Sequence, residues 1–242
     1  MLIYGLALLV ISGIYLSTYI GVIGLTLVFW SSVFLYLTPG KYAPLNLLNA
    51  LALSNLNNVE RILLELNLSD KGVYLPPKRL DNPETSLVFI PRKLDATMPS
   101  IVETSKQLFF SKDSSGIFLT PPGLPLLNLF EEELGYSFIK PSLNDFQKIL
   151  PKLLVEDLDL AREVVIQIQG EFVLVELTHN ILSKICEETS KFPRTHKLLG
   201  CLLSSAIACA LAKSAGNAVS ISEDEQNMDS KLTRLKYRVF NV

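Results

Sequence analysis

The N-terminal stretch decides the architecture of this chain. Residues 2–40 read LIYGLALLVISGIYLSTYIGVIGLTLVFWSSVFLYLTPG and contain no Asp, Glu, Lys, Arg or His. A single straight helix of this length would measure about 58 Å at 1.5 Å per residue, whereas the hydrocarbon core of a bilayer is only about 30 Å thick. The chain must therefore turn back, and we expect a transmembrane helical hairpin that contacts the lipid bilayer through residues 2–38.

Polar residues and glycine predict where this hairpin turns. Ser17–Gly21 interrupts the aliphatic run, so we expect one helix at about 2–16 and a second at about 21–37, which Pro39 and Gly40 end. Small residues on both helices could allow close packing of the pair, although the favoured interpretation is that glycine is simply common in membrane helices; they are Gly5, Gly13, Gly21 and Gly24.

The flanking charges predict the orientation of the hairpin. The expected turn has no Lys or Arg, whereas Lys41 follows the second helix, so the positive-inside tendency places both termini in the cytoplasm. A secretory signal is disfavoured because a positive n-region is missing and the apolar stretch is too long. We therefore expect a two-span protein of the cell membrane with a cytoplasmic soluble domain.

Composition limits the partners of that domain. Its net charge is −2, whereas nucleic-acid binding needs a basic surface, so we expect no nucleic acid. Three cysteines are an odd number and are not spaced as a disulfide framework, which indicates free thiols in a reducing compartment. They are Cys186, Cys201 and Cys209.

Periodicity beyond the hairpin predicts an α+β fold with antiparallel strands. We divide the chain into a hairpin (1–42), a juxtamembrane helix (43–70) and a soluble domain (71–242). The apolar patterns and turn residues predict helices at 45–66, 125–134, 142–160, 180–189 and 195–215. They predict strands at 72–75, 87–90, 108–110, 116–119, 164–169, 172–177, 218–222 and 232–240.

Local signals refine three of these elements. Ser142 is a helix cap, and Pro151 is a point where the helix can split. The last two strands are expected to be joined by an acidic loop over Glu223–Ser230. The uncharged run Leu198–Ala212 is too short for a third membrane span, so we expect a buried, Ala-rich core helix.

An ordered set of features runs along the chain: the apolar hairpin, the segments Gly72–Pro77, Leu87–Pro91, Leu119–Gly123, Phe130–Gly135 and Leu153–Ala161, an Ala-rich helix near Ala206–Ala215, and the last strand. With this set the chain resembles a family of archaeal membrane-anchored proteins of unknown function. The resemblance covers nearly the whole chain and implies the two-helix anchor, the α+β domain and an archaeal source, but no activity, cofactor or site residue.

The soft metal ligands do not form a recognisable site. His179, Cys186, His196 and Cys201 lack the two tight Cys/His pairs that zinc sites use, so we expect no metal. Cys201 lies early in a helix, where a thiol pKa can fall, but a buried core residue is the favoured interpretation.

Acidic runs offer paired carboxylates for acid–base work, although such runs usually form solvated helix faces. They are Glu131–Glu133, Glu156–Asp157 and Asp159. The sequence contains no Walker pattern and no nucleophile elbow. We therefore expect no catalytic residue, no cofactor and no enzyme activity.

An interaction surface is the remaining hypothesis for a site. Pro121 and Pro122 could dock a partner in extended form, although a rigid turn is favoured. Arg234, Lys236 and Arg238 alternate along the last strand and could meet acidic lipid or an acidic partner, although cross-strand pairs with Glu are favoured. Tyr74–Arg79 could present a basic, aromatic surface, with a strand end as the plainer alternative.

We therefore expect a non-catalytic scaffold, accessory or sensor subunit at the cytoplasmic membrane face, with a protein partner or as a homo-oligomer. One alternative is a small-molecule or lipid-binding sensory domain with a pocket lined by Phe109, Phe110 and Phe118. Another is a membrane-anchored enzyme, which would need Cys201, His196 and a carboxylate in one cleft.

Overall fold

The computed structural model describes residues 2–37, 56–66, 68, 71–80, 82, 85–92, 116–227 and 231–240. The chain forms two compact units, Met1–Leu48 and Asn49–Val242.

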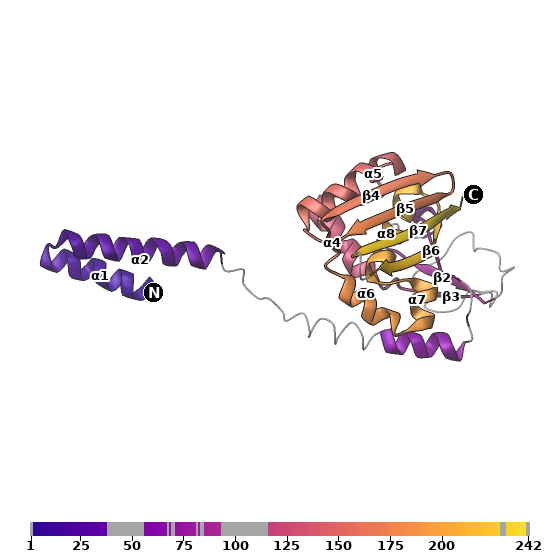
Figure 1. Ribbon diagram of the computed structural model, residues 1–242, viewed down its shortest axis with the longest axis horizontal. Helices are drawn as coiled ribbons and strands as arrows, with labels where there is room; N and C mark the ends of the chain where they lie inside the picture. The colour runs from indigo at the N-terminus through magenta and orange to yellow at the C-terminus, as the bar shows by residue number, and fades with distance from the viewer. Residues whose placement is uncertain are drawn as a thin grey trace. The chain divides into compact units, whose positions relative to one another are not determined.

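The first unit is a hairpin of two apolar helices, α1 (Leu2–Tyr15) and α2 (Thr18–Leu37), which lie side by side (Figure 1). The turn is tighter than the expected Ser17–Gly21, because α2 already begins at Thr18. The Ser17 carbonyl oxygen accepts hydrogen bonds from the Gly21 N–H (3.3 Å) and from the Ser12 hydroxyl (2.9 Å). These bonds satisfy the carbonyl at the tip within the chain.

Three of the four glycines lie at close contacts between the two helices, which supports the packing interpretation that was the less favoured one. A Cβ added to Gly5 would lie 2.8 Å from a Val28 methyl, and one added to Gly24 would lie 3.1 Å from the Gly5 carbonyl oxygen. A Cβ on Gly21 would lie 2.7 Å from the Ser12 hydroxyl oxygen. Gly13 has no such neighbour within 4 Å among the described residues, so the packing interpretation does not hold there.

The surface of the hairpin is apolar. Its exposed side chains include Ile3, Tyr4, Val22 and Trp30, and Leu16 at the tip is 92% exposed. By length and composition, one helical stretch of the described chain could cross a membrane, Pro193–Ala215, and 83% of its most apolar window is buried in the second unit. Within the described residues of the hairpin, the apolar helical stretches Ile3–Tyr15 and Thr18–Phe34 are shorter than the 18 residues that this criterion requires.

The second unit is built on an antiparallel sheet of seven strands within the described residues, in the order β3-β2-β1-β6-β7-β5-β4. This confirms the α+β class and the antiparallel pairing. The strands are β1 (Val73–Tyr74), β2 (Val88–Pro91), β3 (Gly116–Leu119), β4 (Glu163–Gln169), β5 (Phe172–Thr178), β6 (Ala218–Asn227) and β7 (Leu232–Phe240). The strand expected at 108–110 lies outside the described residues, and β3 pairs with β2.

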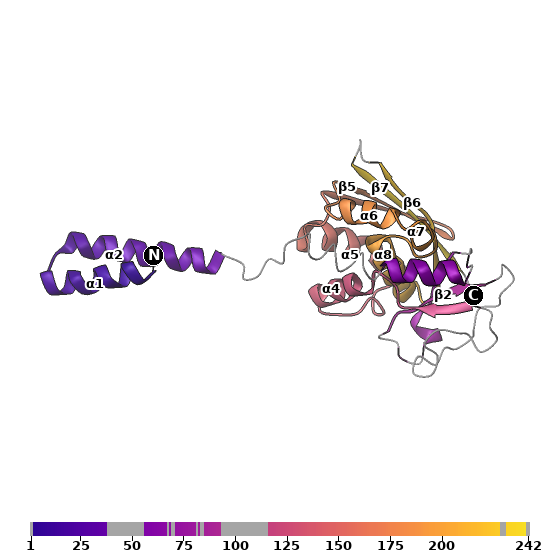
Figure 2. The ribbon, with the colours of Figure 1, turned by 90° about the horizontal axis from the view of Figure 1, so that it is seen from below.

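Helices cover one face of this sheet (Figure 2). They are a helix at 56–65, α4 (Leu124–Leu134), α5 (Leu143–Lys152) with the π-helical turn η2 (Leu153–Asp157), α6 (Ser183–Ser190), α7 (Pro193–Leu199) and α8 (Leu202–Ala215); a 3-10 turn, η1 (Pro77–Arg79), follows β1.

Helix α8 is the centre of the core. It packs on β6, β7 and β1, while α4, α5 and α6 pack around it. Every residue from Leu203 to Lys213 is buried, and the many alanines allow close approach on all sides. The expectation of a buried Ala-rich core helix is confirmed.

The single helix expected at 195–215 is wrong, because the chain breaks between α7 and α8. Gly200 has φ 70° and ψ −173°, a conformation that essentially only glycine adopts. Cys201 then caps α8, where its sulfur accepts from the Ser204 N–H (3.4 Å). We call residues 199–202 the α7–α8 junction.

Two further boundaries differ from the sequence expectation. Strand β6 continues to Asn227, so most of the expected acidic loop is strand paired with β7. Helix α6 begins at Ser183 and not at Asn180, because the Asn180 carboxamide oxygen accepts the Leu182 N–H (2.9 Å) in a turn.

The expected cap of α5 is confirmed, whereas Pro151 does not split the helical segment but lies just before its change from α-helix to π-helical turn. Ser142 and Asp145 form a reciprocal capping box, and these hydrogen bonds lower the pKa of the Asp145 carboxyl below its usual value. Pro151 lies one residue before the end of the α-helical part, after which η2 continues the segment as a π-helical turn.

Candidate functional site

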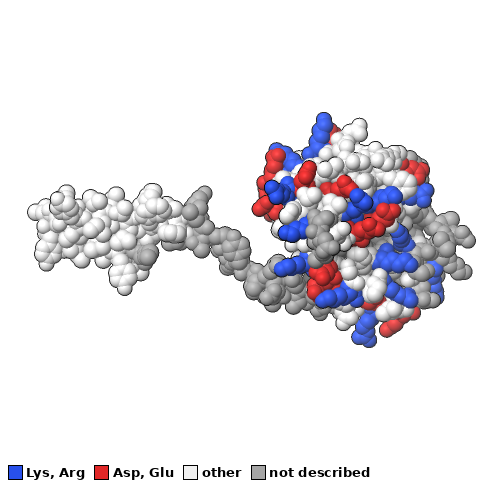
Figure 3. Space-filling model, in the orientation of Figure 1, with Lys and Arg blue, Asp and Glu red and all other residues white. Residues whose placement is uncertain are grey.

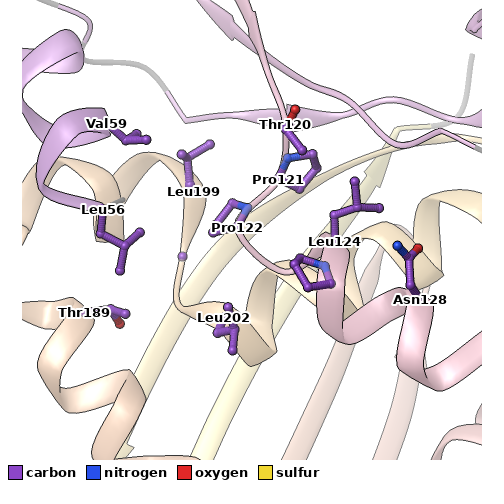
Figure 4. Close-up of a pocket in the computed structure, with 12 residues that line it drawn as sticks. Leu56, Val59, Thr120, Pro121, Pro122, Leu124, Asn128, Thr189, Leu199 and Leu202 are labelled. Atoms are coloured by element: carbon purple, nitrogen blue, oxygen red, sulfur yellow. The ribbon is translucent and has the colours of Figure 1, made fainter. Parts of the chain in front are cut away.

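An apolar pocket of about 480 Å³ lies in the second unit, where the chain segments around the α7–α8 junction meet (Figure 4). This volume falls within the roughly 300–1,000 Å³ typical of small-molecule sites. The described residues that line it are Leu56, Val59, Thr120, Pro121, Pro122, Leu124, Pro125, Asn128, Thr189, Leu199, Gly200 and Leu202.

The loop before α4 forms one wall of the pocket. The Gly123 N–H donates to Ser205 Oγ (3.0 Å), and a Cβ on Gly123 would lie 2.1 Å from the Ala206 backbone nitrogen. Glycine is therefore needed for this loop to lie directly against α8. This contact holds the rings of Pro121 and Pro122 at the pocket, where prolines give a stiff wall.

The α7–α8 junction forms a second wall. Hydrogen bonds from β1 and from the residue before it hold this junction in place. The buried Tyr74 hydroxyl donates to the Leu199 carbonyl oxygen (2.5 Å) and lies 3.0 Å from Ser205 Oγ. The Gly72 N–H donates to the Leu198 carbonyl oxygen (2.8 Å). Burial raises the pKa of Tyr74 well above its usual value, so the hydroxyl keeps its proton and remains a donor.

The helix at 56–65 forms the third wall and is held to α7 by a buried carboxylate. Glu60 accepts hydrogen bonds from the Thr195 N–H (2.7 Å), the Thr195 hydroxyl (2.6 Å) and the Arg194 N–H (3.1 Å). These N–H groups belong to the first turn of α7, which has no capping side chain of its own. The cap places Leu56 and Val59 on the opposite side of Pro122 from Leu124 and Asn128 (Figure 4).

The lining of the pocket determines the ligand chemistry that it fits. Most of the described lining side chains are aliphatic or proline, three carry a neutral polar group, and none is charged. The polar ones are Thr120, Asn128 and Thr189. An ionised ligand group would lose its hydration without gaining an ion pair, so the pocket fits an uncharged, mainly apolar molecule.

Next to the junction lies a buried group of sulfur, carboxylate and imidazole. Cys186 Sγ lies 2.8 Å from Cys201 Sγ. The Asp224 carboxylate accepts from the Cys201 N–H (3.1 Å) and from the Ser204 hydroxyl (2.6 Å), and it lies 3.6 Å from His196 Nε2. The structure thus brings together three of the four candidate soft ligands, Cys186, His196 and Cys201, with an acid that the sequence did not single out.

This group lacks the geometry of a nucleophilic site. Asp224 contacts the backbone of Cys201 and not its sulfur, and none of these side chains lines the pocket. Burial raises the pKa of the Cys201 thiol well above its usual value, which favours the unreactive thiol. His179 lies apart in a left-handed turn after β5, and the described residues hold no group of three or more ligands suited to a metal ion.

The basic stripe on β7 is neutralised by acids on the neighbouring strands and turn. Arg234 pairs with Glu176 (2.8 Å), Lys236 with Glu223 (3.0 Å) and Arg238 with Glu171 (3.2 Å). The face of the second unit seen in Figure 3 likewise shows Lys and Arg interspersed with Asp and Glu. The favoured cross-strand interpretation is therefore confirmed.

Comparison with known proteins gives a family without a function. Residues 6–238 match the family described as Domain of unknown function (DUF7982). The chain belongs to this family. No curated protein and no solved structure matches it. Membership of DUF7982 supports the expected resemblance to an uncharacterised family, while it indicates neither a source organism nor a membrane anchor.

Three other expectations for this DUF7982 chain change with the structure. Glu131 is not part of a solvated face, because it pairs with buried Lys213 (3.0 Å), whereas the other acids of the three expected runs are exposed. Tyr74 is buried, so it presents no aromatic surface. Phe118 packs on Phe89 in a separate small core and does not line the pocket, while the residues at 109–110 lie outside the described chain.

Sequence reasoning found Pro121 and Pro122 but missed the other walls of the pocket. Leu56 and Val59 carried a signal, since an amphipathic helix must pack its apolar side on something. Glu60 and Asp224 carried no such sequence signal, because a carboxylate that caps a distant helix cannot be told from a surface acid in the sequence.

Proposed function

We propose that this protein is a membrane-anchored, non-catalytic sensor or accessory subunit whose soluble unit binds a small, uncharged, apolar molecule in the pocket at the α7–α8 junction. The pocket carries the proposal, because it combines a ligand-sized volume, an apolar lining and walls that buried hydrogen bonds hold in place. A fatty chain or another lipid-derived hydrophobe has the matching chemistry.

The anchor rests on the hairpin. Its charge-free sequence and exposed apolar side chains would be costly in water, whereas lipid would cover them. Lys41 supports a cytoplasmic soluble domain, and the archaeal source is part of the same proposal.

A non-catalytic role is favoured by the state of Cys201, the cysteine that a membrane-anchored enzyme would use as its nucleophile. The Cys201 sulfur is buried, its pKa is raised, and the nearby carboxylate holds its backbone. A binding protein that passes its state to a protein partner or to a second copy of itself needs no such nucleophile. The ion-paired strand face and the proline-walled pocket are the surfaces available for that contact.

We expect the chain to stay in the membrane pellet after alkaline carbonate extraction. The variant Val10→Asp/Leu25→Asp places one charge on each helix, and each charge costs about 2.5–3.5 kcal/mol near the middle of a span. We expect at least half of this variant in the supernatant. The control Ile62→Asp changes an exposed apolar residue of the second unit and should stay in the pellet. Equal extraction of all three proteins would contradict the anchor.

We expect a photoactivatable diazirine analogue of a fatty alcohol to label the pocket of the full chain in detergent. Peptide mapping by mass spectrometry separates label on Thr120–Asn128, Thr189 and Leu202 from label on the hairpin, which serves as an internal reference. Leu202→Trp should fill the pocket and reduce pocket labelling about tenfold relative to hairpin labelling. Leu129→Trp, an exposed site on α4 outside the lining, should leave the ratio unchanged.

Labelling confined to the hairpin in the unaltered chain would overturn the ligand-binding proposal. So would equal pocket labelling in the two tryptophan variants, provided that their thermal unfolding midpoints match that of the unaltered protein.

A further inference from the structure

Two of the three cysteines face each other inside the second unit. The Sγ atoms of Cys186 in α6 and Cys201 at the start of α8 lie 2.8 Å apart, although they are far from adjacent in the sequence. Nonbonded carbon atoms already prefer about 3.5–4.0 Å, and sulfur is larger than carbon. The two sulfur atoms are therefore in direct contact, closer together than ordinary packing would place them.

The backbone around both cysteines is held in place. The carbonyl oxygen of Cys186 accepts from the Thr189 hydroxyl (2.7 Å) and from the Ser190 hydroxyl (3.1 Å). The Cys201 N–H donates to the Ser204 hydroxyl oxygen (2.8 Å) and to Asp224 (3.1 Å). These bonds fix the end of α6 and the beginning of α8, so both sulfur atoms keep their facing positions.

We propose that Cys186 and Cys201 form a reversible intrachain disulfide that ties α6 to the α7–α8 junction. The bond would tie the junction wall of the pocket to α6, which contributes Thr189 to the lining, since Thr189 lies one turn after Cys186, and Gly200 and Leu202 flank Cys201. The effect on the pocket rests on the proposed ligand-binding function, whereas the bond itself does not.

A low-molecular-weight disulfide is the oxidant that balances the reaction. The thiolate of one cysteine attacks a sulfur of the small disulfide and releases one small thiolate, which leaves a mixed disulfide on the protein. The thiolate of the second cysteine then attacks the protein sulfur of that mixed disulfide and releases the second small thiolate. The two cysteines are oxidised, the small disulfide is reduced to two thiols, and the two cysteine protons end on those thiols.

Burial makes this exchange slow and selective. Each side chain is only 1% exposed, so a small disulfide reaches the sulfur atoms when α6 moves away from the junction. Cys209 is also buried in α8, but no sulfur partner for it is found among the described residues. Cys209 therefore serves as the control: a buried cysteine that is not expected to form the disulfide.

The test uses the full chain in detergent, incubated either with oxidised glutathione or with dithiothreitol, then denatured and alkylated. Trypsin separates Cys186 from the peptide that holds both Cys201 and Cys209. We expect the oxidised sample to contain these two peptides joined, in the unaltered protein and in Cys209→Ser. The joined species should be absent from Cys186→Ser and Cys201→Ser.

Thermal unfolding gives a second readout that does not depend on the serine variants folding. A disulfide that closes a loop of about 15 residues should raise the midpoint of the oxidised protein by about 5–10 °C over the reduced protein. Free, alkylated Cys186 and Cys201 after oxidation would overturn the proposal. So would a bond from Cys186 to Cys209 or between two chains.

The same samples separate this inference from the pocket. We expect oxidation to change pocket labelling by the fatty-alcohol diazirine at least threefold, with hairpin labelling unchanged. Joined peptides without any pocket labelling would overturn the ligand-binding proposal and leave the disulfide standing. Pocket labelling with both thiols free would overturn the disulfide and leave the ligand-binding proposal standing.

Discussion

Replacing Gly200 by alanine should lower the free energy of unfolding by about 3 kcal/mol or more, through two separate effects. The backbone at this position is in a region that costs other residues about 1–3 kcal/mol. The new methyl would also lie 2.4 Å from Ser204 Oγ and 2.6 Å from Ile221 Cδ1, and such overpacking costs about another 1–3 kcal/mol. Thermal unfolding followed by circular dichroism, in one detergent for all variants, measures the loss.

Gly135→Ala is the matched control for this prediction. Gly135 also has a left-handed φ of 71°, at the end of α4, but nothing described lies within 4 Å of its added Cβ. Only backbone strain applies there, so we expect a loss of about 1 kcal/mol. Equal losses at the two glycines would show that the junction has room for a side chain and that its break has another cause.

Replacing Glu131 by alanine should destabilise the fold by about 3–5 kcal/mol, because it removes the carboxylate from a buried ion pair. The Lys213 side chain is 2% exposed, and its Nζ lies 3.0 Å from each carboxylate oxygen of Glu131. Glu131 also accepts from the Ser137 hydroxyl (2.6 Å) and the Phe138 N–H (2.9 Å). Removing it takes the carboxylate away from a buried ammonium group and from two further donors at once.

Lys213→Met should cost less than Glu131→Ala, because Glu131 is 18% exposed and keeps its two other hydrogen bonds. Glu131→Gln/Lys213→Met should recover part of the stability lost in Glu131→Ala, since it removes both charges together. Unfolding in urea measures all three.

The exposed pair Glu188–Lys191 on α6 is the control for the buried pair. Its Nζ–Oε1 distance is shorter, at 2.6 Å, but the side chains are 35% and 63% exposed. We expect Glu188→Ala to cost no more than about 1 kcal/mol, and less as salt is added. A loss at Glu131 as small as that at Glu188 would mean that burial does not strengthen the ion pair.

Local patterns in the sequence determined much of the fold. The charge-free stretch predicted the helical hairpin, and the alternation on β7 predicted which side chains are buried and which are paired with acids. The capping box of α5 and the β4–β5 hairpin across Gly170 were also predictable. Each of these signals acts between residues a few positions apart, where helix and strand periodicity hold without knowledge of the rest of the chain.

Sequence-based predictions were wrong where tertiary contacts override local helix and loop signals. The apolar, alanine-rich run predicted one helix at 195–215. Gly200 inside it did not predict a break, because a single glycine is tolerated within a helix. The break exists because the Leu199 carbonyl oxygen is held by Tyr74 and the Cys201 N–H by Asp224, two residues from other strands. Likewise, the acidic residues from Glu223 onwards resembled a loop in the sequence. In the structure they form part of β6, where Glu223 and Glu225 lie opposite Lys236 and Arg234 of β7.

The charge-free hairpin, the α+β class and the alternating faces of the last strands follow from the amino-acid sequence alone, because periodicity and turn chemistry are local. The pocket, the facing cysteines and the buried ion pair depend on the tertiary fold. Tyr74 and Ser205 are separated by 131 positions, and Glu60 and Thr195 by 135. Contacts over such distances depend on how β1 is placed beside β6 and how α8 is enclosed, and no local pattern encodes either of these.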